Sequence, residues 1–461
     1  MDPSEIADWM PRLEPGGRPL YLQIATAIED AIAAGRLRPG DRLPSQRLMA
    51  ETLGIDLTTA TRAYAEARRR HLLDAVTGRG SFVAARPDPD HPPLDLAMNI
   101  PPRPRGLNLG EMLRQGIGEV LGRTDPDLLM SYHPGAGLVA EKAAGAVWLA
   151  PVVGTVAHDR IAVAPGAQAA LTAILSLNAA PGDTVLCEAL TYPGLIDTCR
   201  LLRLKLRGVV MGPRGMRIDA LSEAARETGA KIVCVSPSMQ NPTASTMSGP
   251  DRAAFAATAT DHGLTVIEDD PYGLLAREPI RAIAAMAPAQ SWHIATLSKC
   301  LTPGLRTAFV TAPDANAATR LAGALRALTL NGPPLMAALA ARWIRDGSAE
   351  ALRDAVRVEA EARQLLARAL LPPGGIAHES GLHVWQHLPA HWNRKRLIAA
   401  ARRHGLGLMP SDAFAVDPAA APDAVRLSLG AIPDRARLRA ALETLAAIMN
   451  GDAAAQGAVA G

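Results

Sequence analysis

The chain has 461 residues, of which 48% are hydrophobic and 20% charged, and its formal net charge is +3. This length exceeds what one ordinary hydrophobic core organises, so we expect more than one domain. The sequence has no apolar run of about 18 residues, and its acidic start MDPSEIADWM is unlike a secretory signal. These features favour a cytoplasmic protein without a membrane span.

The cysteines are consistent with this compartment. Their spacing is not that of a metal site, and their number is too small for a disulfide framework. We therefore expect four buried, small hydrophobic side chains and no metal: Cys187, Cys199, Cys234 and Cys300.

The first 85 residues predict three helices followed by a hairpin. Residues 19–34 place their apolar side chains on one helical face and are followed by Gly35 and by Pro39-Gly40. A second helix is expected over 45–53 with Ser45 as N-cap, and a third over 57–73 with Asp56 as N-cap. The inner face of the third helix is predicted to hold Ala60, Ala63, Tyr64 and Ala67. The Gly-Arg-Gly run at 78–80 then predicts the turn of a small hairpin.

This arrangement is typical of a DNA reader. A helix-turn-helix needs a third helix that presents short polar and arginine side chains to phosphates and bases. Residues 12–85 contain 11 arginines against 8 acidic residues, which is a weak additional sign of nucleic-acid binding. The alternative is a protein-binding module in which Arg47, Arg62 and Arg79 are only solvated surface charges.

The runs LPSQRLMAETLGIDLTTATRAY and GRGSFV resemble the GntR family of winged helix-turn-helix proteins. The resemblance implies that Arg47 contacts phosphate or base, and that Thr58, Thr59 and Arg62 read the site. It also implies that Arg79 and Gly80 reach toward the minor groove. Leu57 occupies a position where many relatives have arginine, so the base preference there departs from the family pattern. We expect this DNA-binding domain to span residues 12–85.

A Pro-rich linker is expected over residues 86–95, because Pro alternates with charge in RPDPDHPP. Beyond it, short apolar runs alternate with helical stretches, which predicts an α/β domain with a mostly parallel central sheet. The predicted strands are 161–164, 184–189, 231–236, 264–270, 293–298 and 308–312. Residues 345–450 predict a smaller α+β subdomain within a domain of residues 96–452, and 453–461 a disordered tail.

The second domain contains the chemical parts of a pyridoxal 5'-phosphate site, which needs a lysine, an acid for the pyridine nitrogen, phosphate donors and an aromatic face. The lysines are Lys142, Lys205, Lys231, Lys299 and Lys395; Lys142 and Lys205 fall in predicted helices, and all except Lys299 have a surface explanation. Lys299 follows a strand and the hydroxyls of Thr296 and Ser298. Asp269 closes a predicted strand and could pair with a pyridinium nitrogen.

Further parts of this site lie at turns. The turn Pro165–Gln168 precedes a helix whose free N–H groups could hold phosphate. Tyr192 is the expected stacking ring, since only 3% of the chain is aromatic. Tyr272 and Asn241 offer hydrogen bonds to the phenolic oxygen of the cofactor. The alternative is an α/β domain that retains these residue types without binding cofactor.

The motifs GAQ, TYPG, NPT, EDDPY, SKxxxPGLR and a late RLS occur in the order found in fold type I aminotransferases, which residues 95–450 therefore resemble. The resemblance implies that Lys299 forms the Schiff base and that Arg426 binds the α-carboxylate of an effector. It implies cofactor contacts from Ala167, Gln168, Tyr192, Asn241, Asp269, Tyr272, Thr296, Ser298 and Arg306. Ala244 departs from the family, which has glycine there.

A GntR-type reader followed by an aminotransferase-like domain is the layout of the MocR subfamily of bacterial regulators, which this chain resembles. The resemblance implies a homodimer that binds double-stranded operator DNA and senses an amine or amino-acid effector through aldimine exchange at Lys299. Two alternatives remain open: an active aminotransferase with an accessory reader, and a cofactor-free DNA binder. The sequence leaves open the effector, the operator, the sign of regulation and any transamination turnover.

Overall fold

The structure is a computed structural model that describes residues 9–10, 13, 18–34, 36–37, 41–70, 72–76, 80–83, 94–133 and 135–451. The chain divides into two compact units. The first, the reader unit, comprises Met1–Leu94, Ala399–Gly407 and Gly451–Gly461, and the second, the large unit, comprises Asp95–Ile398 and Leu408–Asn450. The expected tail 453–461 and residues 86–93 of the expected linker lie outside the described residues.

The reader unit has the predicted order of three helices and a hairpin. Its elements are α2 (Leu20–Ala33), α3 (Gln46–Leu53), α4 (Leu57–Arg69), β1 (Leu73–Val76) and β2 (Gly80–Val83). Both predicted N-caps are confirmed: Ser45 accepts a hydrogen bond from the Leu48 amide (3.2 Å), and Asp56 from the Thr59 amide (2.8 Å). The third helix is shorter than expected, because Leu73 pairs with Val83 in the antiparallel hairpin.

The core of the reader unit forms where the three helices meet. The predicted inner face of α4 is confirmed, since Ala60, Ala63, Tyr64 and Ala67 are all buried. The Tyr64 hydroxyl donates to the Pro44 carbonyl at 2.6 Å and so ties α4 to the turn before α3. This packing fixes the angle between the two helices of the helix-turn-helix.

The large unit is built on a seven-stranded sheet in the order β4-β12-β11-β10-β9-β5-β6. Its strands are β4 (Ile161–Ala164), β5 (Thr184–Glu188), β6 (Lys205–Val209), β9 (Ile232–Val235), β10 (Thr265–Asp269), β11 (Ser291–Thr296) and β12 (Ala308–Thr311). Only β12 runs antiparallel to its neighbours, so the mostly parallel sheet is confirmed. The edge strand β6 was missed, and Lys205 was wrongly placed in a helix. Exposed and partly buried residues alternate along β6, so it carries no apolar run.

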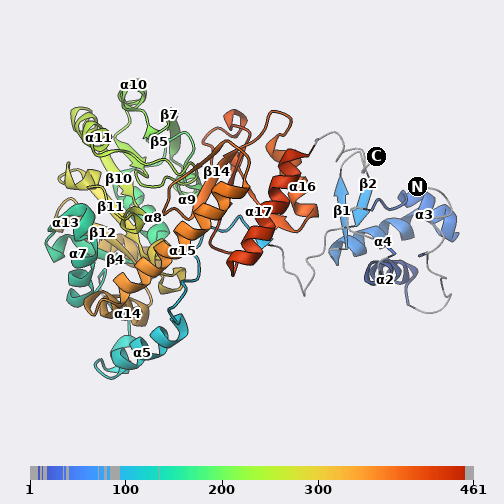
Figure 1. The fold of residues 1–461 in the computed structure, drawn as a ribbon, viewed down its shortest axis with the longest axis horizontal. Coiled ribbons are helices and arrows are strands. Elements are labelled where there is room, and N and C mark those ends of the chain that lie inside the picture. Colours follow the sequence, from blue (N-terminus) through green and yellow to red (C-terminus); the bar gives the residue numbers. More distant parts are fainter. Residues whose placement is uncertain are drawn as a thin grey trace. The chain divides into compact units, whose positions relative to one another are not determined.

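Helices cover both faces of this sheet (Figure 1), as expected for strands that are apolar throughout. On one face Ile232 and Cys234 pack in the cluster that contains α8 (Ala167–Asn178), α9 (Pro193–Leu201) and α13 (Ala315–Thr329). On the other, Val233 and Val235 pack with α10 (Ile218–Thr228) and α11 (Gly249–Asp261). Further helices are α5 (Leu109–Leu121), α6 (Pro126–Leu129), α7 (Val139–Val153) and α14 (Pro334–Arg345), and a small hairpin joins β7 (Met211–Gly212) to β8 (Gly215–Met216).

The predicted α+β subdomain is also present. It contains the four-stranded sheet β13-β14-β17-β16, formed by Gly375–Ala377, His383–His387, Ala424–Ser428 and Met409–Pro410. Its helices are α15 (Ser348–Leu370) and α17 (Arg435–Asn450); α16 (Arg394–Arg403) begins in the large unit, and its residues from Ala399 are grouped with the reader unit. Leu94–Asp95, expected at the end of the linker, instead form β3, whose Leu94 amide donates to the Gly405 carbonyl (2.9 Å) before β15 (Leu406–Gly407).

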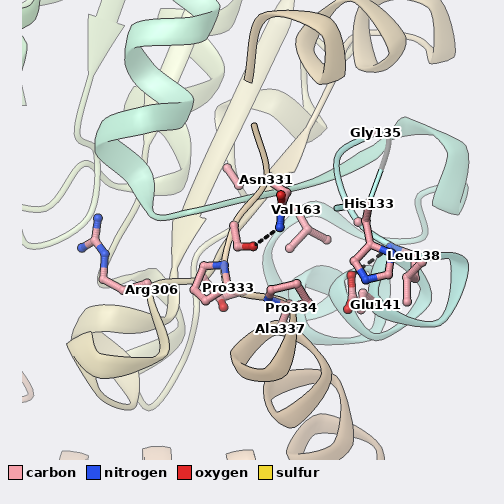
Figure 2. A pocket seen from close by; sticks show the side chains of 14 residues that line it. His133, Gly135, Leu138, Glu141, Val163, Arg306, Asn331, Pro333, Pro334 and Ala337 are labelled. Carbon is pink, nitrogen blue, oxygen red and sulfur yellow. Dashed lines mark hydrogen bonds between the residues drawn. The ribbon is translucent and has the colours of Figure 1, made fainter. Parts of the chain in front are cut away.

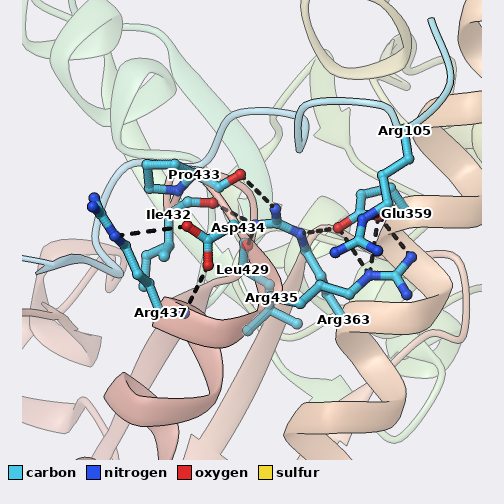
Figure 3. A network of polar contacts seen from close by, with 9 residues as sticks. All are labelled: Arg105, Glu359, Arg363, Leu429, Ile432, Pro433, Asp434, Arg435 and Arg437. Carbon is cyan, nitrogen blue, oxygen red and sulfur yellow. Dashed lines mark hydrogen bonds and ion pairs between the residues drawn. The ribbon is translucent and has the colours of Figure 1, made fainter.

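A buried ionic network links α15 to the turn between β17 and α17 (Figure 3). Glu359 and Arg363, each at most 2% exposed, pair at 2.9 Å, and Glu359 also accepts from Arg435 (2.7 Å). Arg363 donates to the carbonyls of Leu429 and Ile432, both at 2.7 Å. The end of the strand that carries Arg426 is therefore anchored to α15.

The four cysteines are buried and form no disulfide, as expected for small core side chains. Across the described residues, no helix combines the length and the apolar character needed to cross a membrane.

Candidate functional site

The candidate cofactor site of the large unit lies at the carboxyl ends of β10 and β11. Asp269 is the last residue of β10, and the chain passes from β11 directly into the short helix α12 (Leu297–Cys300), which carries Lys299. The strand predicted to reach Ser298 therefore ends at Thr296. Because β10 and β11 are parallel neighbours, the acid and the lysine emerge at the same sheet edge, where α/β folds place ligands.

The pKa of Lys299 lies closer to physiological pH than that of a solvated lysine. Burial, together with the nearby Arg426 guanidinium, lowers its pKa to about 8, while Asp269 opposes the shift. The ammonium donates to the backbone carbonyl of Asn99. A lysine whose pKa is lowered toward neutral pH is a better nucleophile than a solvated lysine, because a larger fraction of its molecules carries an unprotonated amine with a free electron pair.

Asp269 has the properties expected of an acid that pairs with a cationic nitrogen. Its Oδ1 is buried and has no hydrogen-bond partner among the described residues. Burial raises its pKa to about 7, with a further contribution from Asp270. It lines a cavity together with the ring of Tyr192 and the side chain of Glu188. This unpartnered oxygen beside an aromatic ring fits the protonated nitrogen of pyridoxal 5'-phosphate.

The start of α8 forms an anion cradle. Gly166 has φ +96°, and a Cβ there would come within 2.9 Å of Arg306 Nη2. The helix begins at Ala167 without a side-chain cap, which leaves first-turn N–H groups available for an anion. Arg306 Nη2 donates to the Pro165 carbonyl (3.1 Å), so its guanidinium is held at the same turn.

Thr296, Ser298 and Gln168 have different surroundings. Thr296 Oγ1 donates to Ser298 Oγ (3.0 Å), which places both hydroxyls beside Lys299 in the chain. Gln168 instead braces α9, since its Nε2 donates to the Gly194 carbonyl (3.0 Å) and to Thr198 Oγ1 (2.8 Å). Its Oε1 is buried and has no partner among the described residues.

Arg426 on β17 is a buried guanidinium in the same site. It is 5% exposed, donates to Asn241 Oδ1 at 2.8 Å and to the Ala97 carbonyl, and lies over the Phe414 ring at 4.9 Å. Its Nε has no hydrogen-bond partner among the described residues. Burial lowers its pKa, although an arginine stays charged at neutral pH. Such a group favours an anionic ligand such as a carboxylate.

Most of the predicted residues converge at this site. Arg426 and Asp269 both influence the pKa values of Lys299, Tyr192 and Tyr272, so these side chains share one electrostatic environment. Ala244, where we noted a departure from glycine, is buried with φ +58°. The left-handed backbone expected of glycine is therefore kept with an alanine.

Sequence reasoning missed two buried polar residues here. Asn99 Nδ2 donates to the Tyr272 hydroxyl at 2.8 Å and lies 3.4 Å from Nδ1 of His383. His383 Nε2 in turn lies 3.1 Å from the Gln240 carbonyl. Asn99 is 200 residues from Lys299 in the sequence, and no local pattern signals its position.

A small hollow lies beside the start of α7. Figure 2 shows that Glu141, His133 and Asn331 face it, whereas the guanidinium of Arg306 at its edge points away. Glu141 accepts from the Leu138 amide at 2.8 Å, and burial raises its pKa. The Arg306 guanidinium is held by the Pro165 carbonyl and points away from this hollow.

The candidate DNA-reading surface lies in the reader unit. Thr58 and Arg62 are exposed on α4, and Arg47 is exposed on α3. Arg62 lies over the Tyr21 ring at 4.4 Å, which orients its guanidinium. The Thr59 hydroxyl donates to Asp56 (2.7 Å), so this residue also supports the helix cap.

The hairpin contributes a second part of this surface. Gly80 is exposed with φ +114°, and a Cβ there would lie 3.2 Å from Nε of Arg42. Arg42 was not among the predicted residues, yet it lies beside the hairpin, where its backbone forms an isolated antiparallel β-bridge with Phe82. The predicted Arg79 lies outside the described residues.

The fold and the two sites define a winged helix-turn-helix joined to a pyridoxal-phosphate-dependent aminotransferase fold. Residues 20–83 match the family described as bacterial regulatory proteins, gntR family, and residues 94–445 match aminotransferase class I and II. The chain belongs to the GntR-type transcriptional regulators that carry an aminotransferase class I and II domain, consistent with the MocR subfamily.

Relatives and solved structures support both halves. The HTH-type transcriptional regulator YdeF of Bacillus subtilis is 30% identical over 91% of this chain and 92% of its own. The vitamin B6 salvage pathway transcriptional repressor PtsJ of Salmonella typhimurium is 28% identical over 89% and 94%. The structure of the α-aminoadipate aminotransferase LysN of Thermus thermophilus shares 25% identity and a TM-score of 0.71, covering 79% of this chain and 93% of that one.

Proposed function

We propose that this regulator binds pyridoxal 5'-phosphate in its large unit and senses an effector that carries both an amino group and a carboxylate. The observation that carries the proposal is that one site contains both Lys299, whose pKa is lowered, and Arg426, a buried guanidinium that can bind an anion. An amine alone would leave the Arg426 charge without a partner, so a ligand with both groups fits best.

Different residues of the site would bind different parts of the cofactor. When bound, pyridoxal phosphate supplies an aldehyde that reacts reversibly with amines and a ring that withdraws electrons. Asp269 would hold the ring nitrogen protonated, Tyr192 would lie against the ring, and Lys299 would hold the aldehyde carbon. The start of α8, with Ala167, would bind the phosphate. Further contacts are proposed from Gln168, Asn241, Tyr272, Thr296, Ser298 and Arg306.

The reader unit would bind operator DNA through α4 and the hairpin. Thr58, Thr59 and Arg62 are proposed to meet base edges or phosphates, and Arg47 a phosphate. Gly80, with Arg79, is proposed to approach the minor groove. Salt-dependent binding to the protein's own promoter, measured with wild type and with Arg62→Ala, tests this assignment.

We also propose a homodimer, since a two-fold assembly presents two readers to a two-fold operator. The support is a run of strongly exposed apolar side chains in the large unit, where Met130 is 70%, Tyr132 79% and Val139 69% exposed. Light scattering at micromolar concentration measures the assembly, and a monomer there would contradict it.

The first experiment on the cofactor is the visible absorption spectrum of purified protein and of Lys299→Ala. A visible band of covalently held cofactor in wild type that is absent from the variant supports the proposal. No band in wild type after incubation with pyridoxal phosphate overturns it and leaves a cofactor-free DNA binder.

A second candidate function is aminotransfer itself. The observation that favours it is the complete set of reactive groups, together with 28% identity over 63% of this chain to the 2-aminoadipate transaminase of Thermus thermophilus. Repeated release of a 2-oxo acid from an amino acid would establish an enzyme. A spectral change at one equivalent without product supports the sensor.

A further inference from the structure

We propose that Asn99 and His383 are positioning residues that fix the direction of the Tyr272 hydroxyl, so that its proton is presented to the cofactor. This inference rests on the proposed cofactor binding at the same site. It follows from counting hydrogen-bond donors and acceptors along a chain of four buried groups: Gln240, His383, Asn99 and Tyr272.

The chain begins at a carbonyl, which can only accept. His383 is fully buried, and its Nε2 lies 3.1 Å from the Gln240 carbonyl, so Nε2 carries the hydrogen. Burial lowers the pKa of His383 to about 3, and the ring is therefore neutral at physiological pH. In a neutral ring the other nitrogen, Nδ1, is an acceptor.

This acceptor settles the orientation of the Asn99 amide. The Asn99 atom that lies 3.4 Å from Nδ1 of His383 must be a donor, which identifies it as the NH₂ group and not the carbonyl oxygen. The same Nδ2 lies 2.8 Å from the Tyr272 hydroxyl. Its two hydrogens are thus divided between His383 and Tyr272.

Tyr272 consequently accepts from Asn99 and must direct its own hydrogen elsewhere. It is 1% exposed, and among the described residues its hydroxyl has no second hydrogen-bond partner. The charged and titratable groups around it are Asp269, Tyr192, Arg426, Cys300 and the neutral His383. The hydroxyl proton is therefore available to the phenolic oxygen of pyridoxal phosphate.

The test is the pH at which the visible band of the bound cofactor changes. Loss of a proton from the nitrogen that joins Lys299 to the cofactor concentrates negative charge on the phenolic oxygen, which a donated hydrogen bond stabilises. Asn99→Leu and Tyr272→Phe are each expected to raise this midpoint by about one pH unit. In the Tyr272→Phe background, Asn99→Leu is expected to add less than about 0.3 unit, because both act through one hydroxyl.

A second variant and a control complete the experiment. His383→Phe keeps an aromatic ring but cannot accept a hydrogen bond from the Asn99 amide, so its midpoint is expected to rise as well. This variant tests the proposal independently if Asn99→Leu fails to fold. Asn178→Leu removes an amide whose hydrogen bond, among the described residues, goes to the Ile174 carbonyl, and its midpoint should equal that of wild type. An unchanged midpoint in His383→Phe, or a full extra shift in the double variant, overturns the positioning role. Absence of any band in wild type overturns the proposed function instead.

Discussion

At the residue scale, burial moves the pKa values of Lys299 and Asp269 in opposite directions because it penalises charge of either sign. The lysine falls to about 8 and the acid rises to about 7. Both groups are therefore close to a change of charge at physiological pH. Asp269 regains its negative charge when a cation is placed against its unpartnered oxygen, which is the condition that a protonated ring nitrogen meets.

The lowered pKa of Lys299 predicts the pH dependence of cofactor capture. Only the neutral amine attacks an aldehyde, so the rate should rise about tenfold per pH unit below pH 8 and level off above it. Stopped-flow absorbance after mixing apo-protein with pyridoxal phosphate measures this profile. A midpoint near that of a solvated lysine would show that burial does not tune this amine.

Arg426 predicts selectivity for a carboxylate. Arg426→Lys keeps the charge but loses the planar pair of donors, so we expect amino-acid affinity to fall by about 10- to 100-fold, or about 1.5 to 3 kcal/mol. Spectral titration with an amino acid and with the matching amine that lacks the carboxylate separates the two effects. Equal losses for both ligands would mean that Arg426 acts on the cofactor and not on the carboxylate.

At the scale of elements, the Glu359 and Arg363 network holds the end of β17 against α15 (Figure 3). Arg363→Met removes one hydrogen-bond donor from the buried Glu359 carboxylate and the donor of the Leu429 and Ile432 carbonyls. We expect the free energy of unfolding of the large unit to fall by about 3 to 5 kcal/mol.

Thermal unfolding followed by circular dichroism measures this loss. The matched control is Arg437→Met, whose side chain is 64% exposed and pairs with Asp434 only at 3.6 Å. It should change the melting temperature little, because exposed ion pairs contribute little to stability. Equal stabilities of the two variants would contradict a structural role for the buried network.

At the scale of the whole molecule, sensing requires a free energy that couples the cofactor site to the reader unit. We expect the effector to change operator affinity by about 5- to 150-fold, and the operator to change effector affinity by the same factor. Fluorescence anisotropy measures the first and spectral titration on DNA the second. Two unequal factors would show that a third equilibrium, such as assembly, participates.

The sequence by itself determined the helices of the reader unit, the alternation of strands and helices and most candidate residues. The physical reason is that caps, helical periodicity and apolar runs act over a few neighbouring residues, as at Ser45 and Asp56. Lys299 and Asp269 could be proposed from the sequence because Asp269 ends a recognisable strand and Lys299 comes soon after another. The edge strand β6 was missed, since it carries no apolar run of its own.

Only the tertiary structure decided what meets at the sheet edge. Asn99 and His383 reach Tyr272 from segments 173 and 111 residues away, and neither position has a local signature. The antiparallel course of β12 and the anchoring of β17 by Arg363 are likewise set by the packing of distant elements. Such contacts join residues that are far apart in the sequence and meet only when the whole chain folds around its core. Local sequence patterns, which act over a few neighbouring residues, therefore do not signal them.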